Sequence, residues 1–529
     1  MKKIITGIVL CWLVVYSASL MAAKPVFIIT ATQRAPAIIF PGQTATASYT
    51  ITNNVPMTLS SIALLSLPAG VSQTGGSCGL LFNLSAGASC SVDLQIVADA
   101  LQGSVTDGPI VCSTLANPVY CSRPAQADLL NVVKGTNPSP PPSPPVQPLH
   151  FVTIGYYSDG ARYLPSSYIS IDNGQSWTVS ATMPPAQSGA NNSLASIVCD
   201  STGIKCAGAG VYDDGFGGAL PLSDTSSDGG NTWQASLTPP PAQAAFNFLN
   251  GIACDRNVMI CTAVGSYNNG GPNIPLSYTS GDGGVSWQVS SILPPAQGGG
   301  QNYLQSVACD STGMKCASVG VYDNGGPSLP LSYTSVDGGN SWQVSSTLPP
   351  VQGIGANVLN SITCDSTGMK CTAVGQYING GPSIPLSYTS SDGGDTWQVS
   401  STLPPVQGNG ESKLFSVACD STRMICTAVG YYKNNALYAS LSYTSQDGGA
   451  TWQVSTTLPP AQGSDDELSG VSCDSSGLIC VAVGTNYDSQ GVPLSFTSSD
   501  GGITWIPSTI MPSVLSPFDN NLTAVSGSH

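Results

Sequence analysis

Short apolar and β-branched runs alternate with clusters of Gly, Pro, Asn and Asp through residues 150–529, and no stretch has a helical period. A segment that begins at Leu359 shows the pattern, with the runs LNSITCD, CTAVGQY, IPLSYTS and TWQVSS separated by STGMK, INGGPS and SDGGD. We predict that these runs are four strands joined by turns. Four such strands in succession form one blade of a β-propeller.

The same four-strand pattern recurs along the chain, and a tryptophan marks each copy. These residues lie 53 to 56 residues apart: Trp177, Trp233, Trp287, Trp342, Trp397, Trp452 and Trp505. Each one ends an eight-residue phrase, from SIDNGQSW (170–177) to SSDGGITW (498–505). A period of this length predicts stacked supersecondary units that bury their apolar faces against one another.

The two ends of the repeat region predict how the ring closes. HFVTIGYY (150–157) matches a second strand of the repeat, and NLTAVSGSH (521–529) matches a first strand. Joining them completes a seventh blade and removes free sheet edges. The fold class is therefore all-β, with a seven-bladed β-propeller over residues 150–529.

The eight-residue phrase resembles the Asp-box, or bacterial neuraminidase repeat, S-x-D-x-G-x-[ST]-W. This repeat occurs in sialidases, in seven-bladed xyloglucanases and in photosystem II stability and assembly factors, and the last are closest in style. Because Asp-Gly and Asn-Gly are hairpin-turn pairs, we interpret the aspartates as structural. They are Asp172, Asp228, Asp282, Asp337, Asp392, Asp447 and Asp500.

Cysteine spacing supports the same division into repeats. Six pairs share the spacing C-x6-C: Cys199/Cys206, Cys254/Cys261, Cys309/Cys316, Cys364/Cys371, Cys419/Cys426 and Cys473/Cys480. Each pair flanks the predicted turn between first and second strands. We expect disulfides rather than zinc sites, because zinc sites favour closer C-x2-C spacing and convergent ligands. Cys78/Cys90 and Cys112/Cys121 are expected to form two further bridges.

The N-terminal region predicts export and a separate module. Residues 1–23 have Lys2 and Lys3, an apolar stretch and two alanines, the order of a secretory signal peptide, although a membrane anchor stays an alternative. Residues 24–135 contain short β-prone runs that suit one small β-sandwich, and CGLLFNLSAGASCSVDLQI resembles immunoglobulin-like modules of bacterial envelope proteins. Residues 136–149 form a Pro-rich linker.

The charge balance narrows the class of partner. The chain has 14 Lys and Arg against 29 Asp and Glu, a net charge of −15. Nucleic acid and anionic membranes are therefore disfavoured. Gly, Ser, Thr, Asn and Gln dominate the polar positions, a composition that suits glycans, envelope proteins or a plain repeat scaffold. We expect a monomer with no membrane span after signal cleavage.

Candidate catalytic groups are few. The sialidase resemblance implies three convergent arginines, yet residues 150–529 hold only Arg162, Arg256 and Arg423, of which the last two lie between paired cysteines. His150 and His529 lie at the ends of the region, so a Ser-His or Cys-His system has no base. No cofactor or metal is expected.

The two glutamates give the alternative hypothesis. Glu411 and Glu467 are expected in loops that lead into first strands, on one sector of the face opposite the Asp-boxes, with Asp465, Asp466 and Asp519. Paired carboxylates at suitable separation are what a glycoside hydrolase needs, so Glu411, Glu467 and Asp519 are its candidate catalytic residues. The plainer interpretation is a solvated acidic patch, and weak cation binding stays open.

A ring of tyrosines is the candidate binding feature. These residues lie 55 apart, each near the end of a second strand: Tyr157, Tyr212, Tyr267, Tyr322, Tyr377, Tyr432 and Tyr487. They either stack on a ligand at the channel mouth or pack between blades, and Tyr487 follows a cysteine register shifted by one. We therefore expect an exported, non-catalytic binding or assembly scaffold for an envelope protein or glycan, with a sialidase- or xyloglucanase-like glycoside hydrolase as the alternative.

Overall fold

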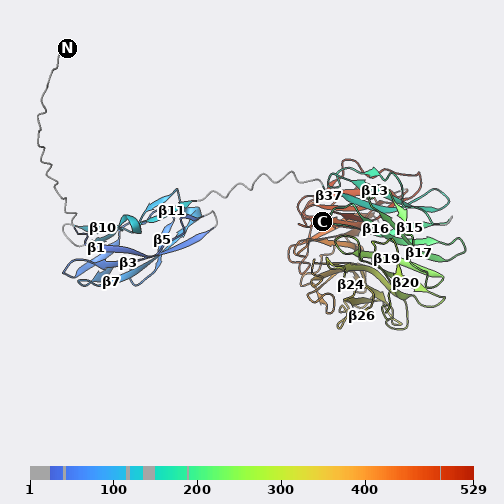
Figure 1. Cartoon of the computed structure of the whole chain (residues 1–529), viewed down its shortest axis with the longest axis horizontal. Helices are drawn as coiled ribbons and strands as arrows, with labels where there is room; N and C mark the ends of the chain where they lie inside the picture. Colours follow the sequence, from blue (N-terminus) through green and yellow to red (C-terminus); the bar gives the residue numbers. More distant parts are fainter. Residues whose placement is uncertain are drawn as a thin grey trace, which may run out of the picture. The chain divides into compact units, whose positions relative to one another are not determined.

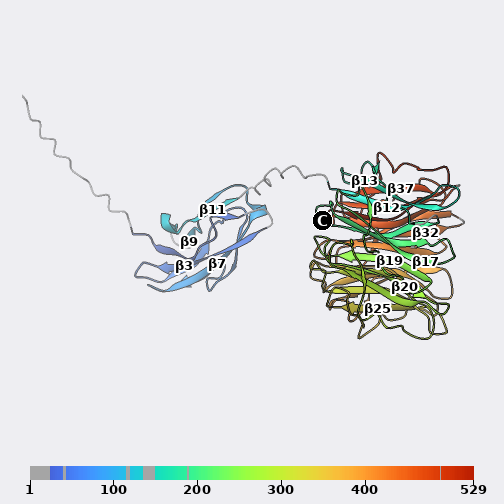
Figure 2. The same cartoon turned by 45° about the vertical axis from the view of Figure 1, so that its right-hand side comes forward.

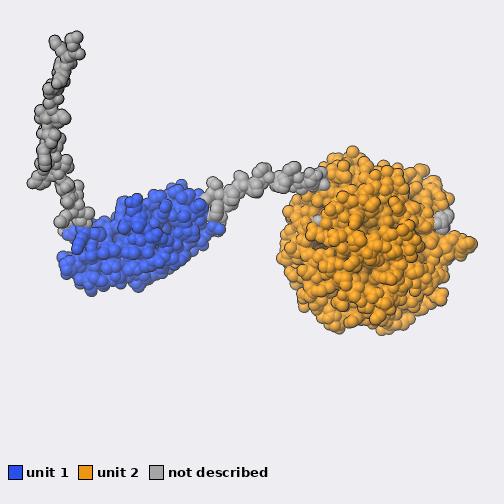
Figure 3. Space-filling view, viewed as in Figure 1, with its two compact units in different colours: residues 1–146 blue, residues 147–529 orange. Residues whose placement is uncertain are grey.

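The structure is a computed structural model of the 529-residue chain. It describes residues 24–39, 43–114, 119–134, 149–187, 190–435, 437–488 and 490–528. The chain divides into two compact units, Met1–Val146 and Gln147–His529 (Figure 3). This boundary falls within the predicted linker, 136–149, of which only residue 149 is described. The predicted signal peptide, 1–23, also lies outside the described residues.

The first unit contains short strands and two single-turn 3-10 helices. They are β1 (Phe27–Gln33), β2 (Ile38–Ile39), β3 (Thr44–Asn53), β4 (Leu59–Leu64), β5 (Val71–Gly75), β6 (Phe82–Leu84), β7 (Ser89–Val97), η1 (Ala98–Ala100), β8 (Val105–Asp107), β9 (Val111–Ser113), β10 (Tyr120–Ser122), η2 (Gln126–Asp128) and β11 (Leu130–Lys134). They form two four-stranded sheets, β1-β3-β7-β5 and β10-β9-β4-β6, and a three-stranded sheet, β2-β11-β8.

One apolar core holds these sheets together. Strand β3 alternates buried and outward-facing residues, as a sheet with one covered face requires, and its Tyr49 and Ile51 pack with Phe27 and Leu94. Disulfides join Cys78 to Cys90 and Cys112 to Cys121. The second bridge spans the paired strands β9 and β10.

The second unit repeats four strands. The first strands are β15 (Asn192–Cys199), β19 (Phe246–Cys254), β23 (Asn302–Cys309), β27 (Asn357–Cys364), β31 (Ser412–Cys419), β35 (Asp466–Cys473) and β39 (Asn520–Gly527). The second strands are β16 (Cys206–Asp213), β20 (Cys261–Asn268), β24 (Cys316–Tyr322), β28 (Cys371–Ile378), β32 (Cys426–Asn434), β36 (Cys480–Asn486) and β12 (Phe151–Ser158).

The outer strands complete each sheet. The third strands are β17 (Ala219–Ser226), β21 (Ile274–Ser280), β25 (Leu329–Ser335), β29 (Ser383–Ser390), β33 (Leu437–Ser445), β37 (Val492–Ser498) and β13 (Tyr163–Ser170). The fourth strands, two residues each, are β18 (Gln234–Ala235), β22 (Gln288–Val289), β26 (Gln343–Val344), β30 (Gln398–Val399), β34 (Gln453–Val454), β38 (Ile506–Pro507) and β14 (Thr178–Val179). The fourth strands are shorter than the runs predict.

These strands form a closed, propeller-like ring. Five sheets have four strands, and a sixth of eight strands joins two repeats through a single pair between β17 and β19. Each first strand contacts the first strands of both neighbours, and β39 contacts β15 and β35. The teal strand β13 and the red strand β37 accordingly lie side by side in Figures 1 and 2. The beginning and end of the unit therefore meet.

The closing sheet, β39-β12-β13-β14, is built from both ends of the unit. Strand β12 pairs antiparallel with β39, with Phe151 opposite Gly527. These two residues occupy the positions that paired cysteines hold in the other repeats.

The first strands surround a cavity of about 620 Å³ at one end of the ring. Each strand contributes one Ile or Val to the lining: Ile197, Ile252, Val307, Ile362, Val417, Val471 and Val525. We call this end the disulfide face, because it carries the disulfide turns, such as 365–370, and the Asp-box turns, such as 391–396. The opposite end, with the loops that follow the second and fourth strands, is the loop face.

Each Asp-box turn is closed by its own hydrogen bonds. In the turn after β29, Ser390 Oγ donates to Asp392 Oδ1 at 2.8 Å, and the Thr396 amide donates to the same oxygen at 2.9 Å. Burial acts to raise the pKa of Asp392, but these hydrogen bonds outweigh it and lower the pKa. The ionised aspartate therefore stabilises the turn through its hydrogen bonds.

The tryptophan of each Asp-box joins neighbouring sheets. Its indole N–H donates to a serine on the third strand of the adjacent sheet, and the seven pairs are Trp177–Ser495, Trp233–Ser167, Trp287–Ser223, Trp342–Ser277, Trp397–Ser332, Trp452–Ser387 and Trp505–Ser442. The pair Trp177–Ser495 joins the closing sheet to the β35–β38 sheet. The chain of contacts thus runs around the whole ring.

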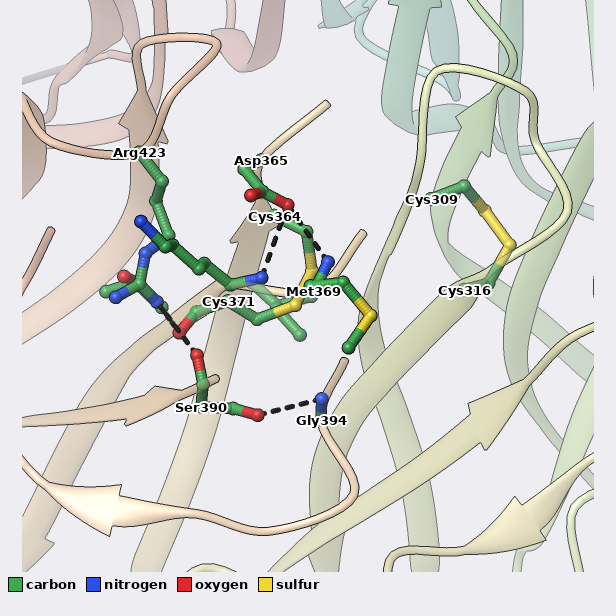
Figure 4. Close-up of a disulfide and its surroundings, with 12 residues drawn as sticks. Cys309, Cys316, Cys364, Asp365, Met369, Cys371, Ser390, Gly394 and Arg423 are labelled. Atoms are coloured by element: carbon green, nitrogen blue, oxygen red, sulfur yellow. Dashed lines mark hydrogen bonds between the residues drawn. A yellow bond between two sulfur atoms is a disulfide. The ribbon is translucent and has the colours of Figure 1, made fainter. Parts of the chain in front are cut away.

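The six C-x6-C pairs are disulfides, and each holds a turn between first and second strands. The aspartate after the first cysteine caps the turn: Asp365 Oδ1 accepts the Met369 amide at 2.9 Å and the Lys370 amide at 3.2 Å (Figure 4). Backbone bonds such as Ser366 N to Ser421 O, at 3.1 Å, link successive turns. These caps were not predicted from the sequence.

One position in the third strands is a buried aromatic residue in most repeats but an aspartate in one of them. Five third strands place a buried tyrosine there: Tyr168, Tyr278, Tyr333, Tyr388 and Tyr443. The Tyr278 hydroxyl donates to the Pro241 carbonyl at 2.6 Å, and the others bond similar loop carbonyls. Strand β17 has Asp224 instead. This carboxylate is fully buried, neither oxygen has a hydrogen-bond partner, and burial raises its pKa well above the usual range.

Restoring the repeat at this position is expected to stabilise the ring. Asp224→Tyr should raise the free energy of unfolding by about 2–3 kcal/mol at neutral pH, because a ring fills the core and a buried carboxyl is removed. A carboxyl whose pKa is raised in the folded state makes the protein less stable as the pH rises above the pKa of the unfolded state. The gain in free energy of unfolding from Asp224→Tyr should therefore be larger near about pH 8 than near about pH 4. Urea unfolding at both pH values measures it.

The matched control is Asp224→Asn, which removes the charge but leaves the side-chain volume unchanged. It should reproduce the pH dependence and only part of the gain. A gain that is the same at both pH values would contradict a neutral, desolvated carboxyl at this position.

Candidate functional site

The three candidate carboxylates lie on the loop face of adjacent sheets. Glu411 immediately precedes β31, and Asp519 immediately precedes β39. Glu467 is the second residue of β35, between them. The expectation that Glu467 lies in a loop is therefore wrong: the strand starts at Asp466, since Asp466 pairs with Asn486 of β36.

Asp466 has a structural role rather than a place on the surface. It is fully buried, and its carboxylate accepts the Gln462 amide at 2.6 Å and Asn486 Nδ2 at 2.6 Å. Asn192 occupies the same position in β15, where it accepts the Gln187 amide. Asp465 is also engaged, because its Oδ1 accepts the Tyr438 amide at 3.2 Å. Neither residue belongs to the candidate catalytic set.

Glu411 is paired with a cation. Its Oε2 lies 3.1 Å from Lys413 Nζ, and its Oε1 accepts the Tyr438 hydroxyl at 3.3 Å. Partial burial acts to raise the pKa of Glu411, but the hydrogen bond and charge of Lys413 outweigh it and lower the pKa. Glu411 is thus an ionised, engaged carboxylate at neutral pH.

Glu467 has the opposite electrostatics. Burial raises its pKa, the Lys413 charge opposes this, and the negative charges of Glu411 and Asp465 add to it. Neighbouring carboxylates whose pKa values are moved apart can divide into an acid and a base. The structure therefore brings Glu411 and Glu467 into electrostatic contact, with Lys413 acting on both.

Aromatic rings surround these carboxylates on both sides. Tyr431 stacks edge-on with Tyr438 at 5.0 Å between ring centroids, and Lys413 Nζ lies 5.5 Å from its ring. On the closing sheet, Tyr156 and Tyr163 form a second edge-on pair at 5.1 Å. The two pairs lie on the two sheets that flank β35.

Tyr487 lies near the pair on the closing sheet and near two of the carboxylates. Partial burial raises the pKa of Tyr487 to about 12, and Tyr156, Glu467 and Asp519 all act in the same direction. Tyr487 is 45% exposed, and two nearby aromatic residues are similarly exposed, Phe518 at 46% and Tyr163 at 38%. We call this group the acidic–aromatic sector: Tyr156, Tyr163, Glu411, Lys413, Tyr431, Tyr438, Glu467, Tyr487, Phe518 and Asp519.

The predicted ring of seven tyrosines divides into two groups. Six of them lie in second strands at equivalent register, and Tyr212, Tyr267, Tyr322, Tyr377 and Tyr432 are partly buried against the cores of their sheets. Tyr157 pairs with Asn520 in the closing sheet. Tyr487 lies one residue beyond β36, where Asn486 takes the register position. The seven therefore do not form one ring of exposed aromatic side chains.

The arginines of the ring do not converge. Arg162 pairs with Asp159 at 3.3 Å in the β12–β13 loop of the loop face. Arg256 and Arg423 lie in disulfide turns on the opposite face. His150 packs against Gly229, and burial lowers its pKa. Within the described residues, no group of three or more His, Cys, Asp or Glu is placed to hold a metal ion. The same residues contain no helix long and apolar enough to cross a membrane.

The carboxylates of the sector and Tyr487 were predicted from the sequence, but the other aromatic members were not. One signal was present: aromatic residues precede the register tyrosine only in GYY (155–157) and GYY (430–432) of the second strands. These extra tyrosines, Tyr156 and Tyr431, flank the sheet that carries Glu467. Departures from a repeat are where a site can be added to it.

No family model matches the chain, and a search of the curated proteins found no similar sequence. Several solved structures are similar in fold. They include the GH74 xyloglucanase from Xanthomonas campestris (15% identity, TM-score 0.38, 59% of this chain), a PL25 ulvan lyase (10%, 0.40, 69% of this chain and 92% of that chain) and Kuenenia stuttgartiensis hydrazine synthase (11%, 0.37, 62% and 91%). The match spans 45% of the xyloglucanase. Identities this low carry no information on activity.

Proposed function

We propose that residues 150–529 form an exported, seven-bladed Asp-box propeller that binds carbohydrate at the acidic–aromatic sector without turning it over. The closed contacts between first strands and the seven Trp–Ser pairs support the blade count. The two four-stranded sheets and the single core of the first unit support an immunoglobulin-like sandwich. Eight disulfides are typical of proteins in oxidising compartments and support export.

The observation that carries the proposal is the set of exposed rings beside carboxylates. Tyr163, Tyr487 and Phe518 are exposed residues, and Glu467 and Asp519 provide acceptors near Tyr487. Sugars combine an apolar C–H face with hydroxyl donors, so such a surface matches both of their features. The sector spans adjacent sheets, which suits an extended oligosaccharide.

The pairing of Glu411 favours binding over catalysis. Its ion pair with Lys413 and its bond from Tyr438 occupy both carboxylate oxygens. A nucleophile or general base needs a free oxygen directed at the reacting group.

A glycoside hydrolase is the second candidate, because the electrostatics of the two glutamates favour it. The raised pKa of Glu467 suits a general acid, and Glu411 or Asp519 would serve as base or nucleophile. Glu467→Gln distinguishes the two functions. Hydrolysis by the parent protein that is lost in the variant, with retained binding, supports the enzyme; absence of hydrolysis in both proteins, with weaker binding by the variant, supports the lectin.

Truncation of the exposed ring tests the binding site. Tyr487→Ala should weaken oligosaccharide binding about tenfold, since one aromatic contact contributes about 1.4 kcal/mol. The matched control is Asp323→Ala, at the corresponding position after β24, which should leave binding unchanged. Isothermal titration calorimetry measures both. Equal affinities of the two variants would contradict a site at the acidic–aromatic sector.

A further inference from the structure

Arg423 departs from the repeat on the disulfide face. Among the six disulfide turns, all of which the structure describes, four have glycine at this position: Gly203, Gly313, Gly368 and Gly477. The position adopts a left-handed backbone, with φ of 55° at Arg423. A long charged residue in this conformation is strained, and such strain persists where the surroundings impose it.

The Arg423 side chain is buried in the protein rather than exposed to solvent. It is 6% exposed, and Nη1 donates to the carbonyls of Cys371 and Ser390, toward which the guanidinium turns in Figure 4. Its Nε is buried and has no hydrogen-bond partner. Burial lowers the pKa of Arg423 to about 10, and the charges of Asp365 and Asp447 oppose this shift. Among the described residues neither carboxylate forms an ion pair with the guanidinium, so the compensation of this buried cation is only partial.

A pocket of about 260 Å³ lies beside this guanidinium, between the β27–β30 and β31–β34 sheets. Lys370, Thr389, Ser391 and Thr396 line it together with Arg423. The one carboxylate in the lining, Asp447, is held by Ser445 and by both the amide and hydroxyl of Thr451. The pocket thus combines two cations with several hydroxyl groups.

The neighbouring sheets lack this combination. Lys315 is the equivalent of Lys370 one sheet earlier, but there Gly368 stands in place of arginine, and Lys315 Nζ lies 3.7 Å from Met369 Sδ. Lys205 contacts Met259 in the same way. Among the six disulfide turns, all within the described residues, this pairing of a lysine with an arginine in the next turn therefore occurs at the boundary between β27–β30 and β31–β34.

We propose that this pocket binds a sulfate or phosphate group, either as the free oxyanion or as an ester on a larger ligand. Arg423 supplies planar N–H donors, Lys370 supplies a mobile ammonium, and the Thr389 and Ser391 hydroxyls complete the donor set. This site is separate from the acidic–aromatic sector, which lies on the other face.

The test follows the thermal unfolding of the oxidised full chain during titration with inorganic sulfate at constant ionic strength. A ligand that binds the folded state raises Tm in a saturable way. Arg423→Gly, which restores the repeat, should lose the saturable rise. Lys370→Ala should require about tenfold more sulfate for half of the effect, and the matched control Lys315→Ala should behave as the parent protein.

Two further arms make the result decisive. Arg423→Lys keeps the positive charge but removes the planar pair of guanidinium donors. If Arg423→Gly does not fold, this variant takes its place in the test, and it should show a weaker response to sulfate than the parent protein. A sulfated oligosaccharide and its desulfated form distinguish the two possible ligands. If the site is for a sulfate ester, the sulfated oligosaccharide should bind more tightly than both its desulfated form and inorganic sulfate. No saturable response of the parent protein to sulfate, phosphate or the sulfated sugar would overturn the proposal, as would an undiminished response of Arg423→Gly.

Discussion

Reduction of the disulfides is expected to lower the free energy of unfolding of the ring more than any single substitution. Each C-x6-C bridge closes a loop with a sequence separation of 7 residues, which corresponds to at most about 2.5 kcal/mol in the chain-entropy model. Six such bridges give an upper limit of about 15 kcal/mol. Because whole domains have only about 5–15 kcal/mol, the reduced ring should be unfolded or nearly so.

Guanidinium unfolding with and without reductant measures this effect. The double variant Cys309→Ala/Cys316→Ala, kept oxidised, is the matched control and should lose no more than about 2.5 kcal/mol. Unfolding of reduced and oxidised protein at the same denaturant concentration would show that the bridges are dispensable and that the Asp-boxes alone hold the ring.

Removal of an Asp-box tryptophan has the second largest expected effect. Trp397→Ala should lower the free energy of unfolding by about 3–5 kcal/mol, because a buried indole is replaced by a cavity at the boundary between two sheets. Trp177→Ala should lower it by a similar amount, since Trp177 makes the same contact across the ring closure, to Ser495.

The matched control is Ser332→Ala, which leaves the indole in place but removes the hydroxyl that accepts the Trp397 N–H and the Ser345 hydroxyl, both at 2.9 Å. It should lower the free energy of unfolding by about 1–3 kcal/mol. Urea unfolding monitored by circular dichroism measures all three variants. A Trp177→Ala variant as stable as the parent protein would contradict a ring closed through the first and last sheets.

Strand order and disulfide pairing could be predicted because every repeat restates them. The β-branched runs recur in seven copies, and the turn Asp-Gly-Gly and the cysteine spacing recur in six. Each imposes a local structure, and the repetition makes that structure unambiguous. The predicted fourth strand was too long for a physical reason: Trp397 packs between sheets, and Ser400 Oγ bonds to the Gly449 carbonyl, so only Gln398 and Val399 remain in the ladder.

The features that could not be predicted depend on single residues that depart from the repeat. The sequence does not show what surrounds such a residue in the folded protein. The sequence placed Glu411 and Glu467 on one sector, but the role of Lys413 between them depends on the arrangement of adjacent sheets. Asp466 was predicted to lie at the surface, and it is instead buried in the position that asparagine holds elsewhere. Asp224 and Arg423 became notable only when their burial was known.

The most direct test of the central claim is a glycan-array measurement on the purified, oxidised protein, with detection of released sugar on the same samples. We predict saturable binding without release, and loss of that binding in Tyr487→Ala. Release of sugar that disappears in Glu467→Gln would contradict the non-catalytic account and establish the glycosidase. Absence of both binding and release would contradict carbohydrate recognition and direct the search to a protein partner.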